Sequence, residues 1–441
     1  MLQQRSPLLT NTTYLIRYHR IDFVIPSLRG IFSDELFVSP RKIPRKLGMT
    51  TCVLSSSTAC CSRHSTIILW LLALLLTCSA RATPVRTDSI THDYKQAVDY
   101  CLFRQYDRAE PALLSIIRQV NHPARQAAIF LLAEEVYLWR GQYTRYVALS
   151  DSLGYRGYNY ELAQRMRSQP AMVLTLPDSV HQSFRLQKRG HVVVTLFVNG
   201  RPKRFLIDTG AQRTMLSTRL AAELGLSTLI DTKVDNSLGQ ALPSSVALLD
   251  SIQFGALQVN HIPVFVQSLW GFNADGALGW DILRQFRITI DYVNRTITLT
   301  NPTGPGSPVP NLLGGSRPLL QVQNKTGGYM TLFCDTGDNG QVTLTPQGKA
   351  KLTDGQPGHT LSFDLGFGGR LRLRRTNAMK QFTIQADGHA QQLRKQSAEL
   401  PAEQISSVLI DGRIGSGFFR HGRLTLDPAR NQYDYQPIQR P

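Results

Sequence analysis

The chain has 441 residues, of which 42% are hydrophobic and 18% charged, the composition of a globular protein with room for two or three domains rather than of a disordered one. Its formal charge is +18, but residues 1–82 hold ten Lys and Arg against three acidic residues, and the rest of the excess is spread thinly. The chain has no long basic run and no zinc-finger, RNA-binding or helix-turn-helix signature, so we expect no nucleic-acid partner. A basic surface of this kind favours loose contact with anions.

Residues 1–82 have the pattern of a targeting region. Arg63 precedes an apolar run from Ile67 to Leu76, and Ala80-Arg81-Ala82 has the small-x-small pattern of a cleavage site. The run is about half as long as a helix that crosses a bilayer. We therefore expect a signal peptide, no stable membrane span, and export of the protein to the periplasm or the medium.

Two alternatives to this cleaved signal stay open. An uncleaved signal would anchor the chain in the membrane. A lipid on Cys78 would do the same, since Leu75-Leu76-Thr77-Cys78 resembles a lipobox, although Thr77 stands where Gly, Ala or Ser is usual. Met49 is a plausible true start of the chain.

Metal and cofactor chemistry is not expected. Cys101 and Cys334 are the two cysteines beyond residue 82, too few for a disulfide framework or a metal site, and the histidines have no ligand spacing. The sequence contains no Gly-x-Ser-x-Gly elbow, no His-Glu-x-x-His pair and no phosphate-binding Gly-x-x-x-x-Gly-Lys loop.

Residues 83–171 are predicted to form a helical domain. Apolar residues recur near helical spacing, for example at Ala97, Cys101 and Leu113. The pattern resembles tetratricopeptide-type hairpins, but about two units are visible, fewer than such an array needs alone. A packing module or prodomain and a partner-binding surface are both open interpretations.

The hydrophobic period changes to two from about Val173. Val192 to Val198 alternates, Asn199-Gly200 supplies a hairpin turn, and strands recur to Thr300. Residues 301–318 are rich in Pro and Gly, and the strand pattern then resumes. The sequence therefore predicts β units over 172–300 and 319–441, joined by a linker over 301–318.

The two β units repeat one set of motifs in the same order. Phe205-Leu206-Ile207 leads into Asp208-Thr209-Gly210, and Leu332-Phe333-Cys334 leads into Asp335-Thr336-Gly337. The further matched pairs are Ser237-Leu238-Gly239 with Asp364-Leu365-Gly366, Asp275–Gly279 with Asp411–Gly415, and Ile288–Asp291 with Leu424–Asp427. Four matches in order indicate an internal duplication.

The duplicated motifs resemble the aspartic peptidase superfamily, in its retropepsin-like and pepsin-like branches, over about residues 185–441. The resemblance implies a mainly β fold with two barrel-like lobes, preceded here by a small α-helical domain. Each lobe would carry one Asp-Thr-Gly loop and one flap hairpin. Because one chain holds both lobes, it would be monomeric for catalysis.

Catalysis in this family implies that Asp208 and Asp335 act as a pair on a polypeptide substrate. Two close carboxylates cannot both ionise cheaply, so they share one proton. The ionised member takes a proton from water and the protonated member hydrogen-bonds the scissile carbonyl. By symmetry, either aspartate can play either part.

The resemblance also implies supporting roles. The hydroxyls would hydrogen-bond across the lobe junction, and the glycines of the motif would allow a tight turn and close approach of the two loops. Flap glycines would contact the substrate. The residues are Thr209, Gly210, Thr336 and Gly337 for support, and Gly239 and Gly366 for the flaps.

Two positions break the symmetry. Asp338 stands where the first motif has Ala211, and Arg413 stands where the first half has Ala277. Asp338 could raise the pKa values of the pair, bind a basic group of the substrate, or mark a decayed lobe. The sequence thus predicts an exported aspartic endopeptidase, and the alternative is a catalytically silent peptide-binding protein with a helical partner-binding module.

Overall fold

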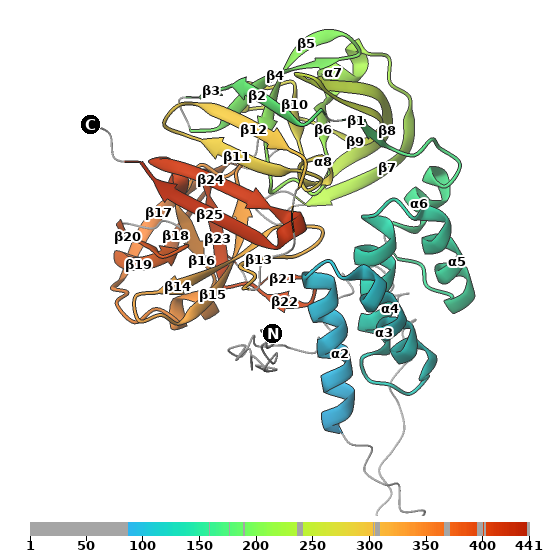
Figure 1. The fold of residues 1–441 in the computed structure, drawn as a ribbon, viewed down its shortest axis with the longest axis horizontal. Helices are drawn as coiled ribbons and strands as arrows, with labels where there is room; N and C mark the ends of the chain where they lie inside the picture. The colour runs from blue at the N-terminus through green and yellow to red at the C-terminus, as the bar shows by residue number, and fades with distance from the viewer. Residues whose placement is uncertain are drawn as a thin grey trace, which may run out of the picture. The chain divides into compact units, whose positions relative to one another are not determined.

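The computed structural model describes most of the chain beyond residue 86 (Figure 1). The described residues are 87–157, 159–175, 177–187, 190–235, 241–302, 304, 309–365, 371–394, 400 and 403–438. The signal peptide predicted within residues 1–82 lies outside them. Among the described helices, none has the length and apolar character needed to cross a membrane.

The first elements are helices. They are α2 (Thr87–Leu102), α3 (Tyr106–Arg118), α4 (Arg125–Phe130), the π-helix η1 (Leu131–Leu138), α5 (Tyr143–Leu153) and α6 (Tyr160–Met166). In α3, Ala109, Leu113, Ile116 and Ile117 form one buried stripe at helical spacing. Every residue of η1 is buried, including Glu134 and Glu135, whose carboxyl groups accept hydrogen bonds from Tyr146 and Ser316.

A nine-stranded sheet follows the helices. Its strands are β1 (Val173–Thr175), β3 (Arg185–Leu186), β4 (Val192–Val198), β5 (Arg201–Ile207), β6 (Met215–Ser217), β7 (Thr228–Asp235), β8 (Ala241–Phe254), β9 (Leu257–Gln267) and β10 (Gly276–Leu278). The predicted hairpin turn joins β4 to β5, with Asn199 and Gly200 at φ angles of 45° and 78°. Short helices α7 (Thr218–Glu223) and α8 (Trp280–Leu283) follow β6 and β10.

A seven-stranded sheet holds the second Asp-Thr-Gly motif. Its strands are β13 (Leu312–Leu313), β14 (Leu319–Asn324), β15 (Tyr329–Asp335), β16 (Val342–Leu344), β19 (Gln381–Ala386), β20 (His389–Arg394) and β23 (Gly412–Gly415). Two separate hairpins are β17 (Pro357–Leu365) with β18 (Leu371–Met379), and β21 (Gln404–Ile405) with β22 (Val408–Leu409). Helices α9 (Pro346–Ala350) and α10 (Ser416–Phe419) follow β16 and β23.

A third sheet joins the two β regions, and Figure 1 shows its strands from distant parts of the chain side by side. The order is β2 (Ser179–Ser183), β12 (Thr296–Thr300), β11 (Arg287–Asp291), β24 (Gly422–Asp427) and β25 (Gln432–Pro437), with the 3-10 helix η2 (Pro428–Arg430) before β25. At its centre β11 pairs antiparallel with β24, so that Ile288 lies opposite Leu426 and Ile290 opposite Leu424. Continuous backbone hydrogen bonding therefore fixes one β region against the other.

The two large sheets present their Asp-Thr-Gly motifs in the same way. β5 runs parallel to β10, which is antiparallel to β6; β15 runs parallel to β23, which is antiparallel to β16. The prediction of a mainly β fold with barrel-like sheets after a helical region is confirmed. The domain boundaries stay a prediction.

The segment predicted to be a linker has ordered contacts. Within residues 301–318, β13 pairs with β14, and the backbone N–H of Gly314 donates to the carbonyl of Leu102 in α2. Leu313 is part of the helical core, as are Phe333 of β15 and Val408 of β22. The described residues from Asp93 onward belong to one compact unit. A composition rich in Pro and Gly thus excludes a long helix here without excluding fixed structure.

Candidate active site

Asp208 and Asp335 lie at the ends of β5 and β15, and each carboxyl group faces the opposite loop. The last three residues of β5 and the last six of β15 are buried, which carries both aspartates into the interior. A Cβ atom built on Gly210 would collide with the carboxyl of Asp335, and one built on Gly337 would collide with the carboxyl of Asp208. The structure thus brings the two predicted catalytic aspartates together, each packed on the glycine of the other motif.

The two threonines of the motifs lock the loops to each other. The N–H of Thr209 donates to Oγ1 of Thr336, and the N–H of Thr336 donates to Oγ1 of Thr209, both at 3.0 Å. The Thr209 hydroxyl donates to the carbonyl of Cys334 at 2.8 Å, and the Thr336 hydroxyl to that of Ile207 at 2.9 Å. All four bonds are buried, so the predicted contact across the junction is present and related by two-fold symmetry.

Backbone amides hold one oxygen of each carboxyl group. Asp208 Oδ1 accepts from the N–H groups of Gly210 and Ala211 at 2.9 and 3.1 Å. Asp335 Oδ1 accepts from the N–H of Asp338 at 3.0 Å. These bonds favour the ionised form of either aspartate and fix its orientation.

Burial opposes the effect of these hydrogen bonds on the pKa values of the two aspartates, and burial is the larger effect. It raises the pKa of Asp208, helped by the charge of Asp335 and by a hydrogen bond between the two carboxyl groups. Burial also raises the pKa of Asp335; the charge of Arg413 lowers it and that of Asp338 raises it, with a net rise. A raised pKa on both sides means that the pair retains one proton over a range of pH in which a free aspartic acid has lost it.

Arg413 makes the two halves electrostatically different. Its Nη1 atom lies 3.5 Å from Oδ2 of Asp335 and 4.0 Å from Oδ2 of Asp338, and its side chain is 11% exposed. In the other half, Ala277 occupies the same place, beside Leu206 of β5 just as Arg413 lies beside Phe333 of β15. The cation therefore favours a negative charge on Asp335 more strongly than on Asp208.

Asp338 lies beside the pair but is turned toward its own loop. Its Oδ1 accepts from the N–H of Gly340 at 2.7 Å, and its side chain is 27% exposed. Its charge disfavours ionisation of Asp335, as one of the three sequence interpretations requires. The same charge is partly balanced by Arg413.

The predicted flap glycines, Gly239 and Gly366, lie outside the described residues. The strands on either side of them pair as antiparallel hairpins, β7 with β8 and β17 with β18. Among the described residues, no cluster of three or more His, Cys, Asp or Glu side chains could hold a metal ion.

Sequence reasoning missed the support behind the Asp208 loop. Asp281 Oδ1, in α8, accepts from both the N–H and the hydroxyl of Thr214 at 2.9 Å, and the N–H of Trp280 donates to the carbonyl of Ala211 at 2.7 Å. The available signal was an acidic residue in the otherwise apolar Trp280–Leu283, which is costly to bury without such donors.

Several known proteins resemble part of this chain. Residues 194–285 match the family model of the gag-polyprotein putative aspartyl protease. UBA domain-containing protein Mud1 of Schizosaccharomyces pombe is 29% identical over 133 residues, 28% of this chain and 39% of Mud1. DNA damage-inducible protein 1 of Cryptococcus neoformans is 25% identical over 155 residues, 34% of this chain and 35% of that protein. The chain thus spans less than half of the length of these curated relatives.

Among solved structures, a retropepsin-like aspartic protease from Rickettsia conorii is similar at 21% identity. The match covers 30% of this chain and 94% of that one, with a TM-score of 0.23.

The prediction of an exported protein, periplasmic or secreted, with anchoring through Cys78 or an uncleaved signal as its variant, is wrong. The matched relatives bear names that refer to DNA damage and to a UBA domain, not to secretion. An apolar run of about ten residues before a small-x-small triplet is a short local pattern. It weighs less than similarity over more than a hundred residues.

The family match includes the strand that ends at Asp208, the Asp-Thr-Gly loop and the Asp-Gly-Ala-Leu-Gly segment of β10. These are the elements that build the site in the first half of the β region. The chain therefore contains a retropepsin-like aspartic protease domain.

Proposed function

We propose that this protein is an aspartic endopeptidase in which two lobes of one chain supply one catalytic carboxyl group each, Asp208 and Asp335. The observation that carries the proposal is the reciprocal packing of each carboxyl on the glycine of the opposite motif. The reciprocal hydrogen bonds of Thr209 and Thr336 support it, because they hold both carboxyls in one fixed geometry.

The proposed chemistry is general acid–base hydrolysis of a peptide bond. One carboxylate takes a proton from a water molecule that attacks the scissile carbonyl carbon, while the other carboxyl group donates its proton to the carbonyl oxygen. As the tetrahedral intermediate collapses, the carboxyl group that took a proton from water gives it to the departing amine. The other carboxylate takes back a proton from the hydroxyl that becomes the new carbonyl oxygen, which restores the starting state of the pair. No metal and no covalent enzyme intermediate enter these steps.

Arg413 assigns the two roles in this proposal. Because its guanidinium group lies beside Asp335 and no cation lies beside Asp208 among the described contacts, Asp335 holds the negative charge and acts as the base. Asp208 then keeps the shared proton and acts as the acid. Arg413 tunes this charge distribution and does not itself contact the reacting atoms.

We assign the helical region to packing rather than to tetratricopeptide-type partner binding. Glu135 of η1 accepts hydrogen bonds from the N–H of Ser316 at 3.2 Å, from its hydroxyl at 2.6 Å, and from the Ser406 hydroxyl at 2.8 Å. The helical core also includes apolar residues of β14, β15 and β22. A surface used in this way is buried against the β region.

Cleavage of a reduced, unfolded polypeptide by the purified chain tests the proposal. We expect endoproteolytic fragments, and we expect a statine-type transition-state mimic to suppress them, since both carboxyl groups would bind its hydroxyl. Binding of the unfolded polypeptide without any cleavage from pH 3 to pH 8 would instead identify the silent peptide-binding protein.

A further inference from the structure

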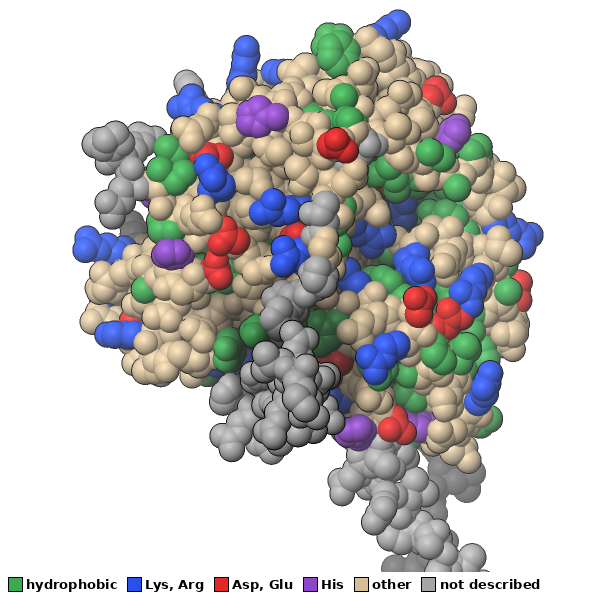
Figure 2. All heavy atoms as spheres, viewed as in Figure 1, with side chains coloured by type: hydrophobic (Ala, Val, Ile, Leu, Met, Phe, Trp, Pro, Cys, Tyr) green, Lys and Arg blue, Asp and Glu red, His purple; other side chains and the backbone are tan. Residues whose placement is uncertain are grey.

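A cavity of about 600 Å³ lies between the helical region and the first large sheet, away from the dyad. Its walls come from the ends of η1 and α6, from β9 and from α8. This volume is within the range of small-molecule sites. Figure 2 shows Lys and Arg side chains gathered around a hollow in this part of the surface.

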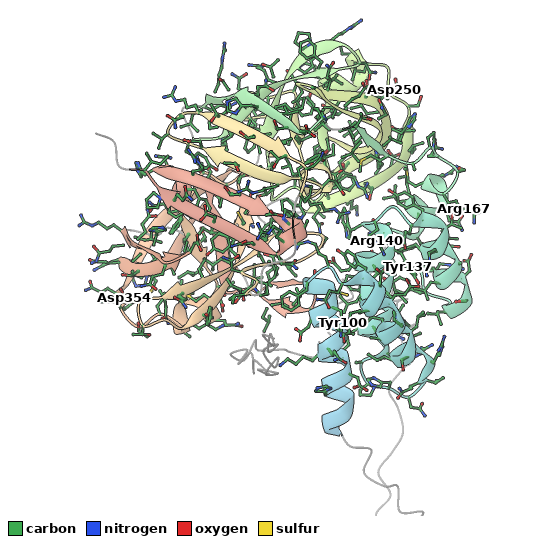
Figure 3. The ribbon with its side chains drawn as sticks, in the orientation of Figure 1. Tyr100, Tyr137, Arg140, Arg167, Asp250 and Asp354 are labelled. Atoms are coloured by element: carbon green, nitrogen blue, oxygen red, sulfur yellow. The ribbon has the colours of Figure 1, made fainter. Side chains whose placement is uncertain are left out.

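Arginines dominate the charge of this cavity. Five of them line it: Arg104, Arg140, Arg167, Arg213 and Arg284. Among the described lining residues, Asp281 is the single acidic side chain. Figure 3 labels Arg140 and Arg167, which extend from the helical region on the side of the first sheet.

Asp281 accepts hydrogen bonds from Thr214 rather than from these arginines. One of its oxygens is occupied by the two hydrogen bonds from Thr214, and the other, Oδ2, is buried without a hydrogen-bond partner. Burial raises the pKa of Asp281, although Arg213, the bonds from Thr214 and the charge of Arg284 oppose the rise. The carboxyl group therefore hydrogen-bonds the loop, and it acts on Arg213 and Arg284 through its charge alone.

Arg213 is the most buried of the five arginines, and its guanidinium group lacks a hydrogen-bond acceptor at one nitrogen. Its side chain is 4% exposed, and its Nε atom is buried without a hydrogen-bond partner. Its guanidinium carbon lies 5.2 Å from the ring centre of Trp139 and 5.6 Å from that of Phe265. Aromatic faces hold the guanidinium in place but accept none of its N–H groups in the plane, where oxyanions bind.

Arg104 also has buried guanidinium nitrogens without hydrogen-bond partners. Its Nη1 atom donates to the carbonyl of Pro428 and to Asn431, but its Nε and Nη2 atoms are buried without partners. Burial lowers the pKa of Arg104 to about 10; Tyr106 raises it, and the like charge of Arg284 lowers it further. Buried guanidinium groups without acceptors are costly, and a bound oxyanion would remove that cost.

We infer that this cavity binds a small, multiply charged oxyanion, carried on phosphate or carboxylate groups. Arg213 forms the buried end of the site, and the exposed Arg140 and Arg167 close around the ligand from the helical side. Guanidinium groups suit either ligand because their paired N–H donors match two oxygens of phosphate or carboxylate.

The site is separable from the proposed peptidase chemistry. Asp208 and Asp335 do not line the cavity. The connection between the two places is the loop that runs from Asp208 to Thr214, with Arg213 directed to the cavity and Thr214 bonded to Asp281. A test of binding therefore gives an answer whether or not the chain cleaves peptides.

Isothermal titration of the full chain with inorganic pyrophosphate and, separately, with citrate tests the inference at constant ionic strength. We expect saturable binding of one equivalent of at least one of them, and the tighter one identifies the anionic group. The double variant Arg140→Gln/Arg167→Gln, altered at exposed positions, should bind about tenfold more weakly or worse, because two charge-assisted bonds are lost.

A matched double variant controls for net charge. Arg118→Gln/Arg394→Gln also removes two exposed arginines, neither of which lines the cavity, and it should bind as the parent protein does. Asp208→Asn should bind unchanged as well. The inference is overturned if neither anion binds, if both double variants lose affinity equally, or if Asp208→Asn abolishes binding, which would move the site to the dyad.

Discussion

Replacing Arg413 by methionine should move the acid limb of the peptidase activity profile to higher pH. The guanidinium lies 3.5 Å from Oδ2 of Asp335. Two unit charges at that distance attract by roughly 5 kcal/mol at an effective dielectric constant of 20. One pKa unit corresponds to about 1.36 kcal/mol, and neighbouring charges in proteins shift a carboxyl by about one to three units. We expect the limb to move by about that amount.

The sign follows from the charges that face Asp335. Arg413 favours its ionised form, whereas Asp208 and Asp338 disfavour it. Without Arg413, Asp335 takes up a proton at a higher pH, and the base is then lost where the parent enzyme still works. The measurement is kcat/KM on a fluorogenic peptide from pH 2 to pH 8.

Asp338→Asn provides the opposite perturbation, because the charge of Asp338 raises the pKa of Asp335. Asparagine keeps an oxygen that can accept from the N–H of Gly340, and the backbone N–H that donates to Asp335 is unaffected. Loss of the negative charge should move the acid limb to lower pH. Limbs that stay in place in both variants would refute the electrostatic reasoning, and limbs that move in the same direction would refute the assigned signs.

Three further predictions concern residues that support the dyad and the helical region. Gly210→Ala should reduce kcat/KM by at least about a hundredfold, because the added methyl group collides with the carboxyl of Asp335; unchanged kinetics would contradict the packing of the two loops. Thr209→Val should lower the free energy of unfolding in urea by roughly 2–4 kcal/mol, because two buried hydrogen bonds are lost, and a loss under about 0.5 kcal/mol would contradict their role. Glu135→Ala should make the helical region more sensitive to limited proteolysis, because it removes the acceptor of three hydrogen bonds, and an unchanged digestion pattern would argue against docking.

The dyad was predictable because its signal is local and repeated. Each motif follows a short apolar strand, and the same order of motifs recurs in the second half of the β region. The strand, the turn and the Asp-Thr-Gly motif are each encoded by a few consecutive residues, so they can be identified in the sequence directly. In each half, the strand before the Asp-Thr-Gly motif pairs with the strand of the later Asp-Gly-x-x-Gly motif: β5 pairs with β10, and β15 pairs with β23.

The functional consequence of Arg413 was not predictable in the same way. The sequence identifies an arginine in place of Ala277, but the 3.5 Å separation from Asp335 depends on parallel pairing of β23 with β15, about 80 residues apart. The cavity lined by Arg213 also needs two distant regions to meet. Single arginines on separate elements carry no periodicity and no motif, so their convergence is visible in the folded chain alone.

The central claim is that one chain supplies both carboxyl groups, and the activity of Asp335→Asn tests it most directly. We predict that this variant loses at least about a hundredfold in kcat/KM, as Asp208→Asn does, because either change leaves one carboxyl without its proton-sharing partner. A homodimer that pairs Asp208 with Asp208 of a second chain predicts otherwise. Near-parental activity of Asp335→Asn beside an inactive Asp208→Asn would contradict the two-lobe dyad.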